Sequence, residues 1–205
     1  MSKRVQRTVE NLEKHNISGC YVENEKQLIE KLKKVIPPNA LIGVGDSMTL
    51  FETGVIEFLR NGNYRFLDKY RAGITGEEKK EIYRQCFSAD VFLSSTNAIT
   101  EKGELYNIDG NGSRVAPMLY GPEQVVIVAG INKIVQNIEE AEKRARNYAA
   151  PTDAKRLGKD TPCANLGYCV DCESKNRICN DFVLIRGQFI KDRIKVIIVG
   201  KQLGY

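Results

Sequence analysis

The chain has 205 residues, of which 42% are hydrophobic and 28% are charged, and its formal net charge at pH 7 is +5. This length suits one large α/β domain, and the mild charge is spread along the chain, which argues against a nucleic-acid binder. No stretch approaches the roughly 18 apolar residues of a membrane span, and residues 1–16 contain no apolar signal core. We therefore expect a cytoplasmic protein with neither membrane nor nucleic-acid partners.

The N-terminal segment, residues 1–36, is expected to contain a helix, a short strand and a second helix. Apolar residues recur every three to four positions over residues 2–15, which predicts an amphipathic helix. Residues 17–22 predict an edge strand or first strand. An N-capping asparagine then begins a helix over residues 24–36, which ends before Pro37.

A buried-type strand at residues 40–44 runs into a turn of glycine and hydroxyl residues, and this turn opens a helix at residues 49–59. Free N–H groups at a helix N-terminus favour an anion, and glycine lets the backbone approach a ligand closely. The alternative is that Asp46 or Ser47 only caps the helix. The residues expected to bind an anion here are Gly43, Gly45, Asp46, Ser47 and Thr49.

Strands and helices continue to alternate along the chain. Strands are expected at residues 64–67, 91–93 and 124–129, and helices at residues 76–87, within 112–119 and at 138–149, where Pro151 follows. The last two strands, 182–185 and 194–199, are expected to pair across a turn. This alternation indicates an α/β fold with an open, mostly parallel sheet and helices on both faces. We expect a single domain over residues 1–205.

Small polar and charged residues crowd the segment between the strands at 91–93 and 124–129. α/β folds bind ligands at the carboxyl ends of their strands. Arg114 suits a carboxylate or phosphate through paired hydrogen bonds, with a structural ion pair as the alternative. Asp109 or Glu101 is expected to act as the catalytic proton carrier, with a solvated turn carboxylate as the alternative. The ligand-binding candidates in this segment are Asn97, Gly110, Asn111 and Arg114.

Three other polar residues are expected outside the site. Lys133, after the strand at 124–129, is more typical of a surface lysine than of an anion ligand, and Glu104 is read as a solvated turn carboxylate. His15 is the only histidine and lies in the polar N-terminal helix. We therefore expect no Ser–His or Cys–His catalysis.

Residues 160–181 have almost no apolar periodicity but carry four of the six cysteines. Their spacing is C-x5-C-x2-C-x6-C. A bound metal centre would explain why four cysteines lie so near one another in a loop without an apolar core. A [4Fe–4S] cluster suits this spacing best, because zinc sites more often show two separate C-x2-C pairs; zinc and free or redox-active thiols are the alternatives. Cys20 and Cys86 are expected to be core thiols. The metal-ligand candidates are Cys163, Cys169, Cys172 and Cys179.

Four motifs together resemble the LUD-domain family of lactate utilization proteins. They are GVGDSMTLFETG, STNAITEKGELYNIDGNGSRV, GPEQVVIVAGINKIV and AAPTDAKRLGKDTPCANLGYCVDCESKNRIC. The resemblance covers nearly the whole chain and implies a NagB/RpiA/CoA-transferase-like fold. In that fold a strand, a Gly-rich turn and a helix hold a phosphate or carboxylate, which would correspond to residues 43–49, while a second loop that brings an acid would correspond to residues 100–114. The resemblance also implies a link to the oxidation of L-lactate to pyruvate, as one component beside iron–sulfur partners.

Two functions stay open at this point. The first is an enzyme, or an oxidoreductase component of lactate utilization, that binds a small anionic metabolite, carries a [4Fe–4S] cluster and works beside an iron–sulfur partner subunit. The second is a non-catalytic subunit or a redox- or metal-sensing regulator in which the cysteine loop is structural. No NAD or flavin fingerprint is present, because Met48 stands where G-x-G-x-x-G requires its third glycine. A homodimer is left open.

Overall fold

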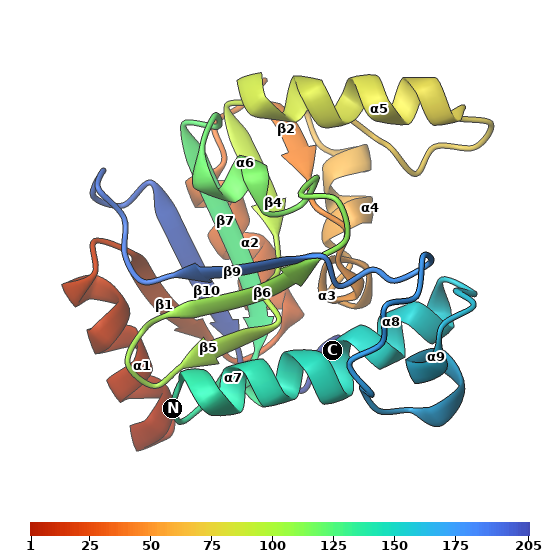
Figure 1. The fold of residues 1–205 in the computed structure, drawn as a ribbon. Helices are drawn as coiled ribbons and strands as arrows, with labels where there is room; N and C mark the ends of the chain where they lie inside the picture. The colour runs from red at the N-terminus through yellow and green to blue at the C-terminus, as the bar shows by residue number, and fades with distance from the viewer.

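A computed structural model describes residues 1–205 and shows an α/β fold built on two sheets (Figure 1). The larger sheet has six strands in the order β1-β10-β7-β4-β2-β3, and all neighbouring strands are parallel. This confirms the expected parallel sheet, with residues 17–22 at its edge. The strands are β1 (Ser18–Val22), β2 (Leu41–Val44), β3 (Arg65–Phe66), β4 (Val91–Ser94), β7 (Gln124–Gly130) and β10 (Ile194–Val199).

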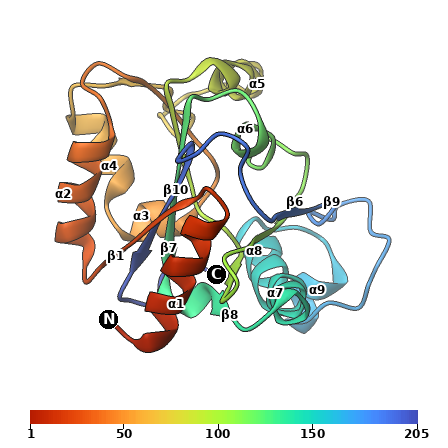
Figure 2. The same cartoon turned by 90° about the vertical axis from the view of Figure 1, so that its left-hand side faces the viewer.

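Helices cover both faces of the larger sheet, as expected (Figure 2). On one face lie α2 (Glu25–Val35), α3 (Met48–Glu52) and α4 (Val55–Asn61), and on the other lie α1 (Lys3–Lys14), α5 (Gly76–Gln85), α6 (Ala116–Leu119) and the smaller sheet. Side chains of a strand point alternately to its two faces. Along β7, Val125 and Ile127 therefore enter one core, and Val126 and Val128 enter the other.

The smaller sheet has four strands in the order β8-β5-β6-β9. They are β5 (Ala98–Thr100), β6 (Leu105–Asp109), β8 (Ile134–Val135) and β9 (Asp181–Ile185). The sequence analysis missed β5, β6 and β8, because these strands are short and adjoin turns rich in Gly, Asn and Asp. The expected pairing of residues 182–185 with 194–199 is wrong. β9 pairs with β6 instead, while β10 lies between β1 and β7, where both of its faces are covered.

Local backbone chemistry sets most helix boundaries. Asn24 caps α2 and Thr75 caps α5, and Thr75 forms a capping box with Glu78. The single helix expected at residues 49–59 is two helices, because Gly54 adopts a left-handed φ of 70° between them. Two 3₁₀ turns, η1 (Cys86–Ser88) and η2 (Ile131–Lys133), follow α5 and β7.

The helix expected to end before Pro151 continues through it. α7 (Ile138–Arg144) leads through a π-helical turn, η3 (Ala145–Ala149), into α8 (Ala150–Arg156). In a regular helix a proline lacks its hydrogen bond and clashes with the carbonyl four residues earlier. The π turn changes the bonding pattern immediately before Pro151, and the helix proceeds. The helix packs on the smaller sheet through Ala141 of α7 and Ala145 of η3.

The remaining helix, α9 (Pro162–Leu166), lies in the cysteine loop. Of the two expected core thiols, Cys86 is buried and Cys20 is half-buried. Burial raises the pKa of Cys86 to about 11. None of the helices has the length and apolar character that crossing a membrane would require.

Candidate functional site

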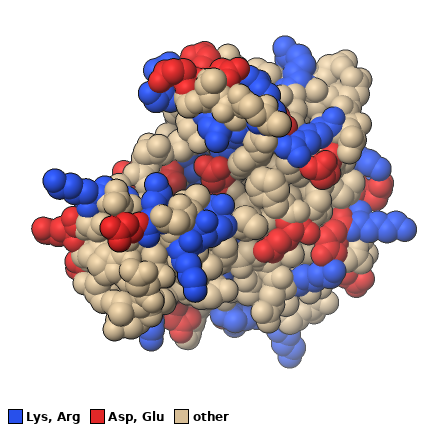
Figure 3. Space-filling model, turned by 90° about the vertical axis from the view of Figure 1, so that its right-hand side faces the viewer, with Lys and Arg blue, Asp and Glu red and all other residues tan.

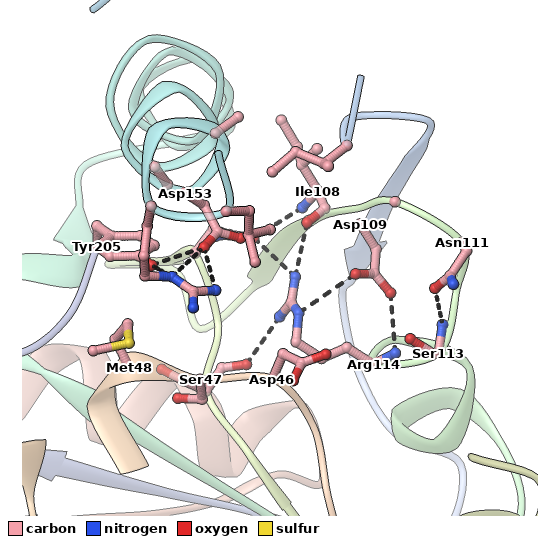
Figure 4. A pocket seen from close by; sticks show the side chains of 18 of the residues that line it. Asp46, Ser47, Met48, Ile108, Asp109, Asn111, Ser113, Arg114, Asp153 and Tyr205 are labelled. Atoms are coloured by element: carbon pink, nitrogen blue, oxygen red, sulfur yellow. Dashed lines mark hydrogen bonds and ion pairs between the residues drawn. The ribbon is translucent and has the colours of Figure 1, made fainter. Parts of the chain in front are cut away.

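A cavity of about 570 Å³ lies where β2, β4 and β7 end. The carboxyl ends of neighbouring parallel strands meet at one edge of the sheet, which is the usual place for a ligand in an α/β fold. Figure 4 shows several of the lining side chains, with Arg114 between Asp46 and Ile108. The cavity brings together these residues from the sequence analysis: Asp46, Ser47, Asn97, Asp109, Gly110, Asn111 and Arg114.

Four of the expected site residues do not line this cavity: Gly43, Gly45, Thr49 and Glu101. The carboxylate of Glu101 instead forms ion pairs with Arg4, at 2.8 Å, and with Arg7 of α1. The structure therefore does not bring Glu101 to the ligand that the cavity would hold. A Cβ on Gly45 would lie 2.7 Å from Cγ of Arg114, so glycine there lets the end of β2 pack closely against that side chain.

The Arg114 side chain is buried, and its guanidinium group forms hydrogen bonds with other residues of the protein. Nη1 donates to Ser95 O at 3.1 Å and to Asn107 Oδ1 at 2.8 Å, while Nη2 donates to Asn97 Oδ1 at 3.0 Å and Ile108 O at 2.8 Å. Nε lies 3.8 Å from Oδ1 of Asp109. All five N–H groups of an arginine thus face protein oxygens. This arrangement supports a structural role, which holds the ends of β4 and β6 together at the cavity wall.

Asp109 and Asn97 take part in the same wall. Oδ2 of Asp109 accepts hydrogen bonds from the backbone N–H groups of Arg114, at 3.0 Å, and Val115, at 3.3 Å. Oδ1 of Asn97 accepts from the N–H of Ile108 at 2.9 Å. The Nδ2 group of Asn97 has no protein acceptor and is half-exposed at the cavity, so it remains a free donor for a ligand.

Lys133 lies at the cavity wall and is buried, contrary to the surface position expected from the sequence. Its Nζ is 2.9 Å from Ser95 Oγ and 3.1 Å from Thr49 Oγ1, and it forms no salt bridge. Burial, reinforced by the positive charges of Arg144 and Arg114, lowers the pKa of Lys133 to about 7. The sequence signal that could have found Lys133 is its position directly after a strand end, like that of Ser47 and Asn97.

A second buried lysine lies behind the opposite wall. Lys69 Nζ is 3.1 Å from Oδ1 of Asp46, and the Tyr70 hydroxyl donates to the same oxygen at 2.9 Å. Burial acts to raise the pKa of Asp46, but the Lys69 charge and the hydrogen bonds from Lys69 and Tyr70 outweigh it and lower that pKa. Asp46 is thus an ionised carboxylate at the cavity. The sequence analysis missed Lys69 and Tyr70.

The cavity lining is basic. Six Lys or Arg side chains and three Asp side chains line it. Figure 3 views the face that carries α5, α8 and α9, and Lys and Arg side chains surround a central hollow there. Concave sites with an excess of one charge concentrate ligands of the opposite sign. The basic residues are Lys79, Arg114, Lys133, Arg156, Lys159 and Arg177.

The four loop cysteines line one separate cavity of about 110 Å³. Burial, together with the nearby thiols of Cys169, Cys163 and Cys172, raises the pKa of Cys179. Cys169 Sγ accepts a hydrogen bond from Asp171 N at 3.4 Å and another from Arg146 Nη2 at 3.7 Å. No three or more His, Cys, Asp or Glu side chains are placed to hold a single metal ion. The four thiols share the lining of this cavity.

The two cavities share a wall made by Ala150, Arg177 and Ile178. Behind Ile178, the loop is fastened to the carboxyl end of β6. Asn180 donates to Asp109 O through its backbone N–H, at 2.9 Å, and to Gly110 O through its side-chain amide, at 2.8 Å. The cysteine loop is therefore part of the construction of the larger cavity.

Comparison with known proteins gives a family match and a shared fold. Residues 5–199 match the family model described as LUD domain. No curated protein matches the chain. A DUF162 family protein from Deinococcus radiodurans superposes with a TM-score of 0.50 at 13% identity, over 98% of this chain and 99% of that chain. At this identity the superposition shows a similar fold.

Two other solved structures are similar to a lesser degree. Ribose 5 phosphate isomerase A from Neisseria gonorrhoeae gives a TM-score of 0.35 at 14% identity, over 81% of this chain and 76% of that chain. The malonate decarboxylase α subunit from Acinetobacter baumannii gives 0.41 at 13% identity, over 99% of this chain and 38% of that chain.

Proposed function

Because the chain belongs to the LUD domain family, whose name links it to lactate utilization, we propose that it binds a small anionic metabolite in the cavity at the ends of β2, β4 and β7. The observation that carries this proposal is that Lys133 is buried and has no negatively charged partner. A buried ammonium group is costly unless an opposite charge compensates it. Lys133 has only hydroxyl partners, so a bound carboxylate would supply the missing charge.

The surrounding residues support an anionic ligand with more than one oxygen, such as a 2-hydroxy or 2-oxo acid. The free Nδ2 donor of Asn97 lies at the same cavity as Lys133 and can serve a second ligand oxygen. Arg156, Lys159 and Arg177 also line the cavity and would attract an anion towards it. Arg114 would position Asn97 instead of contacting the ligand, since its own donors are engaged.

We further propose that the cysteine cavity holds a [4Fe–4S] cluster. Four thiols around a shared space suit a cluster that takes one ligand at each of several corners. A single zinc ion, at a Zn–S distance of about 2.3 Å, would need the thiols to converge on one point. The donor from Arg146 to Cys169 would stabilise thiolate charge in this site. When bound, such a cluster would supply one-electron transfer beside the metabolite cavity.

A second candidate is a subunit or regulator in which the cysteine loop docks a partner. Exposed apolar side chains around the loop favour it, since contiguous apolar surface marks interaction sites. Co-purification with an iron–sulfur subunit, without turnover of any metabolite by the isolated protein, would support this candidate. The exposed apolar residues in and near the cysteine loop are Leu166, Tyr168, Val170, Phe182 and Leu184.

Isothermal titration with L-lactate, pyruvate and acetate tests the metabolite proposal. We expect a 2-hydroxy or 2-oxo acid to bind to the wild type and to bind at least tenfold more weakly to K133M, in which a neutral side chain of similar length replaces the cation. R65A is the matched control, because Arg65 is an exposed cation outside the cavity. Equal affinity of the wild type and K133M for every acid would refute the proposal.

A further inference from the structure

Ser95 and Lys133 form a hydrogen-bonded pair, of which the metabolite proposal uses only the positive charge of Lys133. The two polar atoms are 2.9 Å apart, both residues are buried, and both line the cavity at its strand-end wall. Ser95 comes directly after β4, and Lys133 ends the turn that follows β7. Because β4 and β7 are neighbours in the sheet, the residues that follow their carboxyl ends lie close together.

The hydrogen-bond partners of Lys133 suit a neutral amine. Such an amine has two N–H donors and one lone pair. Lys133 Nζ donates to Thr49 Oγ1 at 3.1 Å and to Ser95 Oγ at 2.9 Å when it is charged. When it is neutral, its lone pair would accept the Ser95 hydroxyl proton across the same 2.9 Å contact. The other acceptors for that hydroxyl are longer, with Thr49 Oγ1 at 3.4 Å and Thr96 O at 3.5 Å. A pKa of Lys133 near 7 makes the neutral form abundant at physiological pH.

Donors for an oxyanion lie next to Ser95 in the chain. The backbone N–H groups of Thr96 and Asn97 have no acceptor within the protein, and neither does Nδ2 of Asn97. All of these residues line the same cavity as Ser95. Unpaired N–H groups beside a nucleophile are the kind of donor that stabilises the charge of a tetrahedral intermediate.

We propose that Ser95 and Lys133 act as a nucleophile and its general base in acyl transfer from a small carboxylate-bearing ester or thioester to water. Serine–lysine pairs of this type perform acyl transfer without histidine, in agreement with the position of His15 outside the cavity. The carboxylate of the substrate is the part of this proposal that rests on the proposed function. In acyl transfer the other cations of the lining, Arg156, Lys159 and Arg177, would hold that carboxylate, because Lys133 acts as a base only in its neutral form. The nucleophile and its base rest on the geometry of Ser95 and Lys133 alone.

The chemical steps balance without any further reactant than water. Ser95 Oγ attacks the carbonyl carbon while its proton passes to Lys133 Nζ. The tetrahedral intermediate collapses, the bond from carbon to the leaving oxygen or sulfur breaks, and the leaving group takes the proton from Nζ. Water then attacks the Ser95 ester and gives a proton to Nζ. Collapse of the second intermediate releases the acid, and the proton returns to Ser95 Oγ.

Labelling with a fluorophosphonate, followed by peptide mass spectrometry, tests this pair on the full-length protein. We expect a single modified residue, Ser95, no labelling of that peptide in S95A, and labelling at least a hundredfold slower in K133M. S113A is the matched control, since Ser113 lines the same cavity without a hydrogen bond to Lys133, and it should label at the wild-type rate. The wild-type rate should rise tenfold per pH unit below pH 7 and level off above it, as the amine becomes neutral.

The outcomes separate this proposal from the metabolite site. A folded wild type whose Ser95 takes no label overturns the nucleophile, and a K133M variant that labels at the wild-type rate overturns the base. In S95A, retained binding of the 2-hydroxy or 2-oxo acid together with lost labelling would support the pair. Failure of labelling in the wild type, with binding intact, would remove the acyl-transfer step and leave the metabolite site standing.

Discussion

The side-chain amide of Asn180 donates to the carbonyl oxygen of Gly110 at 2.8 Å and thereby ties the cysteine loop to the wall of the larger cavity. Loss of this bond should weaken anion binding, because the wall would no longer be held in place. We expect N180A to bind the anion up to about fivefold more weakly, which corresponds to one hydrogen bond of about 1 kcal/mol. Titration of N180A beside N176A, an exposed loop asparagine whose side chain forms no hydrogen bond, measures the difference. Equal affinity in N180A and the wild type would show that the loop does not support the cavity.

The cysteine loop should carry iron and sulfide after anaerobic purification. We expect matching iron and sulfide contents with a broad visible absorption band in the wild type, and loss of both in C172S, because each cysteine supplies one ligand. C20S is the matched control, since Cys20 lies outside the loop in β1. One zinc per chain without colour would refute the cluster.

Anion affinity should fall as the pH rises above about 7. The anion binds the ammonium form of Lys133, and the pKa of Lys133 in the free protein is about 7. Below that pH the free site is already charged and the affinity is flat; above it, binding must take up a proton and the affinity decreases tenfold per pH unit. Titration from pH 6 to pH 9 measures this slope. A flat profile in the wild type would exclude Lys133 as the anion ligand.

The free energy of unfolding should also depend on the protonation of Lys133, and it should increase as the pH rises above about 7. The pKa of Lys133 is lowered in the folded state, so its charged form destabilises the protein below pH 7, and this penalty fades between pH 7 and the ordinary lysine value of about 10.4. K133M removes the buried charge and should unfold at a higher denaturant concentration than the wild type at pH 6. The difference should shrink at pH 9. A K133M variant that is less stable than the wild type at pH 6 would contradict this account of Lys133.

Arg114 should matter more for stability than for contact with the ligand. Removal of its guanidinium breaks four hydrogen bonds to protein oxygens at a buried position. We expect R114M to lose about 3 kcal/mol or more of unfolding free energy in denaturant titrations. R84A is the control, because Arg84 and its partner Glu81 are both exposed, and loss of this ion pair should change stability by less than about 1 kcal/mol. A stable R114M variant that lost only anion affinity would restore the ligand-binding role expected from the sequence.

Local signals in the sequence account for most of the larger sheet and its helices. Asn24 and Thr75 mark helix starts by side-chain capping, which depends only on neighbouring residues. The pairing of β9 with β6 depends on residues far apart in the chain, so a local turn before β10 gave the wrong partner. Short strands such as β5 offer too few residues for a period to be visible.

The site was only partly predictable for a related reason. The rule that ligands bind at strand ends found Asp46, Asn97 and Asp109. Whether a charged residue at a strand end is buried depends on what covers it, and the C-terminal segment decides this for Lys133: Leu203 and Gly204 pack beside it and Thr49. The same limit applies to Glu104, expected as a solvated carboxylate but buried and bonded to Thr100.

The uninterrupted helix formed by α7, η3 and α8 contributes residues to both cavities. Arg144 donates from it to the Asn97 carbonyl at the larger cavity, and Arg146, two residues later, donates to Cys169 at the cysteine cavity. A helix turns by about 100° per residue, at 3.6 residues per turn. Insertion of one residue between Arg144 and Arg146 would therefore rotate the Arg146 side chain away from Cys169 while Arg144 kept its contact with Asn97. The spacing of Arg144 and Arg146 along the helix therefore bears on both cavities at once.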